Sequence, residues 1–328
     1  MWRQYTHVIH DTRDVNEHAA SLSMWDQQYE QLSTGPFQGR VEELRIGPAQ
    51  LFREQTQQAV WQHGLSRPGT VALAVPLAMA SEGWYCGQRL SPGQGFSVQA
   101  DTEFELVTRG PFDVVALDVD QDFLIDYARR VEGVTLAPDW QPSAALGGGA
   151  DARQGALREM LLTTLTTARE MPTLMAHEPM RRALVHAACD ALLAHLPEAQ
   201  DASPAPPRPT HSTRRQVVQD ARAYMRQHID EPIGVPELCE ALNVSRRTLQ
   251  YSFQDVLQLS PVTCLRVLRL NGLRRELLRG ERHTSVADCA AHWGFWHLPR
   301  LAAEYRSLFG ELPSQTLQRA RDGAGAAH

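Results

Sequence analysis

The chain has 328 residues, a formal net charge of −6 and 43% apolar residues, which predicts two or three domains and excludes disorder throughout. No apolar run reaches the roughly 18 residues of a membrane span, the polar start is no secretory signal, and five scattered cysteines favour a reducing cytoplasm over a disulfide framework. Residues 1–212 hold 16 Arg against 26 acidic residues and residues 213–328 hold 16 Arg against 12, which predicts an acidic front domain and a basic tail with different partners.

Residues 1–150 are predicted to form a β-rich domain. Short apolar runs at 71–75, 104–107 and 112–117 are separated by turn sequences rich in glycine and proline. This spacing is typical of a small antiparallel sheet or barrel. We expect this domain to sense an effector.

Residues 151–196 are predicted to form a helical connector. Leu157, Leu161 and Leu165 recur at intervals of four, as expected for one face of a helix. Such a stripe packs either on the sheet or against a second copy of the chain, so a homodimer stays open. Residues 197–212 contain four closely spaced prolines and are predicted to be an extended linker.

Residues 213–322 contain an internal repeat of about 51 positions. The repeated residues are Val235, Leu238, Cys239, Asn243 and Val244 in the first copy and Val286, Cys289, Ala290, Gly294 and Phe295 in the second. Each copy predicts a short helix, a turn that tolerates positive φ, and a second helix. This is helix-turn-helix geometry, present twice, and the apolar spacing of residues 262–278 predicts a long helix between the copies. The fold class is therefore α+β, with a small antiparallel β domain, flanking helices and an all-α C-terminal domain.

Residues 214–321 resemble the DNA-binding domain of the AraC/XylS family of bacterial transcription regulators. The resemblance is carried by 245–249, Ser260-Pro261, Arg269-Leu270-Asn271, 274–278, Val286-Ala287-Asp288 and 308–313. It departs from the family pattern at Gly272, inside the linker helix, where alanine is common. It implies a sequence-specific regulator that is not an enzyme and that binds promoter DNA, a small effector and RNA polymerase.

The stretches 246–250 and 292–298 look most like those of regulators of ethanolamine-utilisation operons, as do residues 25–31 near the N-terminus. That likeness implies ethanolamine as effector, with adenosylcobalamin as a second signal. Regulators of other catabolic operons share such stretches. A ligand-independent DNA-binding or architectural protein stays a further alternative.

The DNA-reading residues are expected on the outward faces of the second helix of each copy. Arginine can bind guanine in a bidentate manner and glutamine can bind adenine. The predicted contacts are Arg246, Arg247, Gln250 and Tyr251 in the first copy and Trp296, His297 and Arg300 in the second. The long helix offers four candidates for phosphate contacts, Arg266, Arg269, Arg274 and Arg275.

No catalytic motif stands out, and the spacing Cys289, His292, His297 is weak support for a metal site because no fourth ligand is near. A small ammonium effector requires a carboxylate and aromatic faces. The front domain offers eight candidates, among which the sequence does not choose: Trp25, Tyr29, Trp61, Trp84, Tyr85, Glu43, Glu54 and Glu103.

Overall fold

The structure, a computed structural model, describes residues 5–98, 102–132, 135–136, 152–194, 209–229, 233–280, 284–295 and 297–325. The chain divides into two compact units, one of residues 1–29 and 38–204 and one of residues 30–37 and 205–328. The division falls inside the predicted linker, most of which lies outside the described residues. Helix α6 (Pro209–Gln227) begins inside the predicted linker, so the last four residues of that linker are helical. Proline is tolerated there because it occupies the first turn of the helix.

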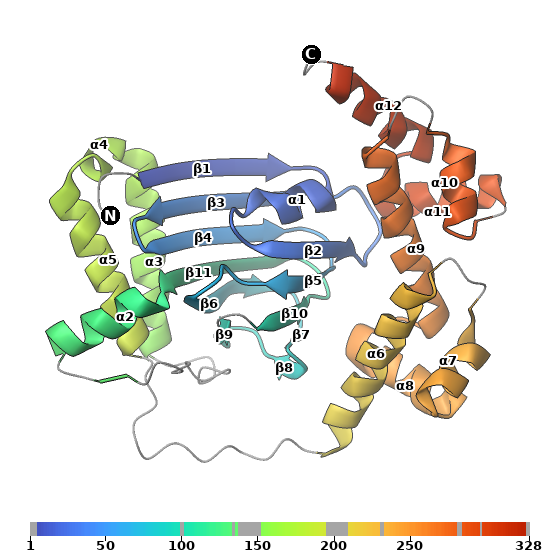
Figure 1. The fold of residues 1–328 in the computed structure, drawn as a ribbon, viewed down its shortest axis with the longest axis horizontal. Coiled ribbons are helices and arrows are strands. Elements are labelled where there is room, and N and C mark those ends of the chain that lie inside the picture. The colour runs from blue at the N-terminus through green and yellow to red at the C-terminus, as the bar shows by residue number, and fades with distance from the viewer. Residues whose placement is uncertain are drawn as a thin grey trace. The chain divides into compact units, whose positions relative to one another are not determined.

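The first unit contains two antiparallel sheets (Figure 1). The larger sheet has the strand order β1-β3-β4-β11-β6-β9 and the smaller sheet the order β2-β5-β10-β7-β8. The strands of the larger sheet are β1 (Tyr5–Thr12), β3 (Gly39–Ile46), β4 (Ala49–Thr56), β6 (Thr70–Met79), β9 (Phe96–Val98) and β11 (Phe112–Asp120). Those of the smaller sheet are β2 (Asp26–Gln31), β5 (Val60–Leu65), β7 (Gly83–Tyr85), β8 (Gln88–Leu90) and β10 (Glu103–Val107).

The central strands of the larger sheet are apolar on both faces. On β11, Val115 and Leu117 belong to one core cluster, while Val114 and Ala116 belong to another. Successive side chains of a strand point to opposite faces, so one apolar run serves two cores. One core lies under helices, and the other includes residues of both sheets.

Helices cover the first of these cores. They are α2 (Gln121–Tyr127), the π-helix η1 (Ala128–Glu132), α3 (Ala152–Glu170), α4 (Pro172–Met175) and α5 (Glu178–Leu193), while the short α1 (Val15–Ser21) follows β1. Leu157, Leu161 and Leu165 are buried in the same cluster as strand residues Leu44 and Leu117. The predicted leucine stripe therefore packs on the sheet and offers no surface to a second copy of the chain.

The second unit is helical. After α6 it contains α7 (Val235–Leu242), α8 (Arg246–Leu257), α9 (Pro261–Leu278), α10 (Val286–His292), α11 (Leu298–Phe309) and α12 (Pro313–Gly325). Figure 1 shows α9 between the group α6–α8 and the group α10–α12. With 18 residues and a rise of about 1.5 Å per residue, α9 is about 27 Å long.

Helix α9 is buried on nearly all sides. Its leucines at 265, 268, 270, 273 and 277 are each at most 7% exposed, and they do not share a single face. The helices on both sides of α9 require this pattern. Gly272 lies where the ring of Trp293 reaches the α9 backbone, since a Cβ atom added at this glycine would meet the ring at 2.1 Å.

Residues Glu30–Phe37 are part of the second unit although they are distant from it in sequence. The buried Glu30 carboxylate pairs with Arg222 at 2.8 Å and with Arg226 at 3.1 Å. The neighbouring Gln31 backbone N–H donates to the side-chain oxygen of Asn271 in α9 at 3.2 Å. A buried ion pair of this kind keeps the segment in one position, because removing either partner leaves an uncompensated charge.

No helix in the described ranges combines the length and the apolar content that a membrane crossing requires.

The contact between Gly272 and Trp293 leads to a first prediction. Gly272→Ala should lower the free energy of unfolding by roughly 1–3 kcal/mol, because the overpacked ring outweighs the better helix propensity of alanine. The matched control is Gly155→Ala in α3, where an added Cβ meets nothing within 4 Å. That change should stabilise by about 0.5–1 kcal/mol. Urea unfolding of both variants makes the measurement, and equal stabilisation by both would contradict the packing described.

Candidate functional site

Helices α7 and α8 form the first helix-turn-helix unit. Asn243 ends α7 with a φ of +51°, a left-handed conformation that asparagine tolerates better than most residues. Ser245 then caps α8, and its hydroxyl accepts a hydrogen bond from the backbone N–H of Thr248 at 3.1 Å. These two local features set the direction in which α8 leaves the turn.

Helix α8 buries one face and exposes the other. Leu249 and Phe253 are fully buried. All four predicted contact residues of this helix are exposed, namely Arg246, Arg247, Gln250 and Tyr251. The guanidinium carbon of Arg247 lies 5.3 Å from the centre of the Tyr251 ring, a cation–π contact that restricts the arginine. The exposed face thus presents the side-chain types that read guanine and adenine edges.

Helices α10 and α11 form the second unit, with the turn at Gly294, whose φ is +74°. His297 caps α11, and its Nδ1 accepts a hydrogen bond from the backbone N–H of Arg300 at 3.1 Å. Both side chains are exposed, whereas Leu301 and Tyr305 are buried. Trp296, the remaining predicted contact, lies outside the described residues.

Glu304 on α11 pairs with two of the predicted contact arginines. One carboxylate oxygen accepts a hydrogen bond from Arg300 Nε at 2.9 Å, and the other pairs with Arg266 of α9. This pairing occupies two guanidinium groups that would otherwise face solvent.

A basic groove lies beside these residues, within the second unit. It has a volume of about 790 Å³ including its open side, and three arginines line it, Arg266, Arg269 and Arg300, together with His297. Gly294 forms part of the wall next to the Arg269 guanidinium. A groove with this charge attracts phosphate, and α11 begins at its edge with its backbone N–H groups.

The other two phosphate candidates on α9 are placed differently. Arg274 is only 2% exposed, pairs with Glu311 at 2.9 Å and lies over the Phe309 ring at 4.5 Å. This burial argues against the predicted phosphate contact of Arg274. The sequence could not show it, because the partner Glu311 lies 37 positions further along the chain. Arg275 is half-buried, and burial lowers the pKa of its guanidinium from the usual range.

Two of the eight effector candidates, Trp25 and Glu54, line one cavity of the first unit. Tyr29 is buried beside it and donates to Glu54 at 2.7 Å. The remaining five lie elsewhere: Glu43 is buried and hydrogen-bonded to Ser23 and Gln50, Trp61, Trp84 and Tyr85 are buried, and Glu103 is exposed. Sequence reasoning missed Gln27 and Gln62, which also line the cavity and which meet Glu54 only because the smaller sheet faces the larger one.

The residues considered for a metal are not gathered. Cys289 is buried in the core, and burial raises the pKa of its thiol to about 12, while His292 and His297 are exposed. In the part of the chain that the structure describes, no three His, Cys, Asp or Glu side chains are grouped to hold a metal ion.

Comparisons with known proteins concern mainly the second unit. Residues 238–319 match the family model of a helix-turn-helix domain. The probable thc operon regulatory protein of Rhodococcus erythropolis is 35% identical over 103 residues, which make up 31% of this chain and 31% of that protein. XylDLEGF operon transcriptional activator 3 of Pseudomonas putida is 33% identical over 97 residues, 29% of each chain.

Among solved structures, a probable AraC family transcriptional regulator from Rhodopseudomonas palustris CGA009 is 32% identical, over 32% of this chain and 97% of that one, with a TM-score of 0.31. The chain spans about a third of the length of the curated relatives above. The matched residues run from α7 into α12 and include both turns. Residues 238–319 are therefore a helix-turn-helix domain, similar in sequence to part of these two transcription regulators.

Proposed function

We propose that this chain is a transcription regulator that binds promoter DNA through both helix-turn-helix units and responds to a small molecule held by its β-rich unit. The main support is the exposed polar face of α8, which carries Arg247 and Gln250 on a helix whose other face is buried. Such a helix fits the major groove of B-DNA. Helix α9 keeps the helix-turn-helix of α10 and α11 at a fixed distance from that of α7 and α8. Helix α11 can therefore enter the next stretch of the groove that α8 enters.

The proposal includes RNA polymerase as a partner and activation as the mode, since operon activators are among the relatives. A homodimer remains an alternative, but its interface would not use the leucines of α3, which are buried against the larger sheet. Ethanolamine, which the sequence resemblance implies, is a small ammonium and belongs to the effectors to be tested. Adenosylcobalamin is far larger than the cavity beside Glu54, whose volume is about 450 Å³, and does not fit there.

Footprinting of the full-length chain on DNA selected from a random pool tests the function. A regulator should protect two adjacent major-groove segments, and a small molecule should alter the protection. Protection that is independent of sequence would support the architectural alternative. Protection of a single segment would mean that only one of the two helix-turn-helix pairs contacts DNA.

The face of α8 leads to a prediction about base reading. Arg247→Ala and Gln250→Ala should each weaken binding to the selected site by about 1–3 kcal/mol and change the preferred base at one position. The control is Gln216→Ala in α6, an exposed glutamine that bonds to Asp220 at 2.8 Å. Fluorescence anisotropy on selected and random DNA makes the measurement. An equal loss on both DNAs would show contacts with phosphate instead of bases.

Glu304 leads to a prediction of opposite sign. Glu304→Gln should bind DNA more tightly and increase the slope of log affinity against log salt by about 1–2, because Arg266 and Arg300 become available to phosphate. Glu240→Gln on α7 removes the same charge but no ion pair among the described residues. The comparison of the two variants at several salt concentrations separates local release of arginines from net charge. Equal slopes would refute the role of Glu304.

A further inference from the structure

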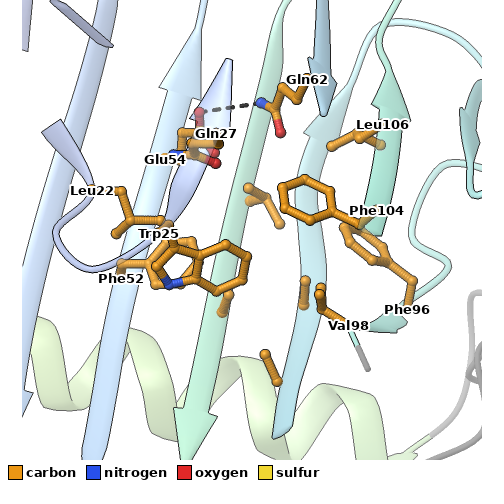
Figure 2. A pocket seen from close by; sticks show the side chains of 14 residues that line it. Leu22, Trp25, Gln27, Phe52, Glu54, Gln62, Phe96, Val98, Phe104 and Leu106 are labelled. Atoms are coloured by element: carbon orange, nitrogen blue, oxygen red, sulfur yellow. Dashed lines mark hydrogen bonds between the residues drawn. The ribbon is translucent and has the colours of Figure 1, made fainter. Parts of the chain in front are cut away.

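The first unit contains a cavity between its two sheets. All the space between its side chains, with the open mouth included, amounts to about 450 Å³. Figure 2 shows the side chains that line it, with Glu54, Gln27 and Gln62 close together at one end. Trp25 and the phenylalanines lie around the remainder.

Small side chains create this space. Ala72 and Ala74 on β6 and Ala116 on β11 line the cavity from the larger sheet, and all three are at most 4% exposed. At these positions the strands face the smaller sheet, where larger residues would fill the core. The opposite face of the same strands carries Leu73, Val75 and other large residues. The alanines that leave space for the cavity therefore lie on only one face of these strands.

Aromatic rings form the walls. The ring of Trp25 lies edge-on to Phe52 with centres 5.6 Å apart and to Phe104 with centres 5.7 Å apart. Trp25 is fixed by a hydrogen bond from its Nε1 to Gln50 at 3.0 Å. Aromatic faces attract cations through the ring quadrupole, and tryptophan does so most strongly. The walls thus suit an apolar group that carries positive charge.

Glu54 is the one acidic side chain among the lining residues. Three donors converge on its Oε1: His18 Nε2 at 3.0 Å, the Tyr29 hydroxyl at 2.7 Å and Gln62 Nε2 at 3.2 Å. Within the described part of the chain, no hydrogen bond reaches its other oxygen, Oε2. Burial and the nearby carboxylate raise the pKa of Tyr29 well above its usual value, so that this hydroxyl stays a donor.

A carboxylate in an apolar cavity favours a partner that supplies both a positive charge and an N–H donor. An anionic ligand would be repelled by Glu54, and a neutral hydrocarbon would leave Oε2 without a hydrogen bond. We propose that this cavity binds a primary ammonium compound with a compact apolar group, the ammonium donating to Glu54 Oε2 and the apolar group lying against the rings of Trp25, Phe52 and Phe104. The proposal rests on the proposed function, for which it names the class of effector.

The full-length chain is tested by thermal unfolding with ethanolamine, n-butylamine and phenethylamine, each paired with the alcohol or carboxylate of the same size. At about 100 times its dissociation constant, a binding amine should raise the unfolding midpoint by about 5–10 °C. The paired alcohols and carboxylates should leave the midpoint unchanged. If no amine raises the midpoint more than its partner, the proposed ligand class is wrong.

Two variants locate the site, and a third is the control. Glu54→Gln should weaken amine binding, measured by calorimetry, about 10–100-fold, since the amide keeps the size but not the charge. Ala116→Leu should block binding by filling the cavity while leaving Glu54 in place. Glu17→Gln, at an exposed position on α1, should bind like the original chain. Unchanged amine binding by both Glu54→Gln and Ala116→Leu would place the ligand elsewhere and overturn the proposal.

DNA binding separates this proposal from the function on which it rests. A chain that binds its selected DNA site but no amine would retain the DNA-binding function and lose the ligand class. A chain that binds amines at this cavity but no DNA sequence would retain the ligand site and lose the regulator.

Discussion

The burial of α9 on nearly all its faces is the constraint on which the DNA-binding unit depends. An exposed helix needs one apolar stripe, but α9 carries leucines around its circumference because helices pack on both sides of it. Each helix-turn-helix unit is thereby fixed to the same rod, and Gly272 lets Trp293 approach the rod at its backbone. The spacing between α8 and α11 then follows from helix packing and needs no flexible connection.

The two helix-turn-helix pairs that α9 joins differ in the charges that they expose. Helix α8 presents two arginines, a glutamine and a tyrosine that are all exposed, whereas α11 begins beside arginines that Glu304 already holds. A guanidinium paired with a carboxylate releases fewer counterions on binding DNA. The helix-turn-helix of α7 and α8 is therefore suited to reading bases. That of α10 and α11 is suited to a weaker contact, whose affinity depends little on salt while Glu304 holds its arginines.

The repeat could be predicted because its signals are local. The Ser245 cap, the left-handed positions at 243 and 294 and the inward Leu249 and Phe253 each involve residues within one or two helical turns. The Arg274–Glu311 pair could not be predicted, because Arg274 on α9 meets Glu311, in the turn between α11 and α12, only when these helices pack together. In the front domain, β11 and β6 could be identified as apolar runs, but β3 and β4 contain buried Glu42, Glu43 and Glu54, which read as surface residues. The sequence likewise included Glu54 among eight candidates without selecting it, since only the packing of the two sheets brings Gln62 and Tyr29 to its carboxylate.

The cavity and the covered face of the larger sheet are two consequences of the same strands. A core that leaves space loses dispersion contacts and is less stable than a filled one. Here the loss is confined to the face toward the smaller sheet, while Leu73, Val75 and Leu117 fill the face under α3 and α5. Alternation along β6 and β11 lets one side of a strand maximise packing and the other side bind a ligand. A buried carboxylate in that space adds a further cost unless its hydrogen bonds are completed. A ligand that completes them stabilises the bound arrangement selectively, and such differential stabilisation is what a shift between two regulatory states requires.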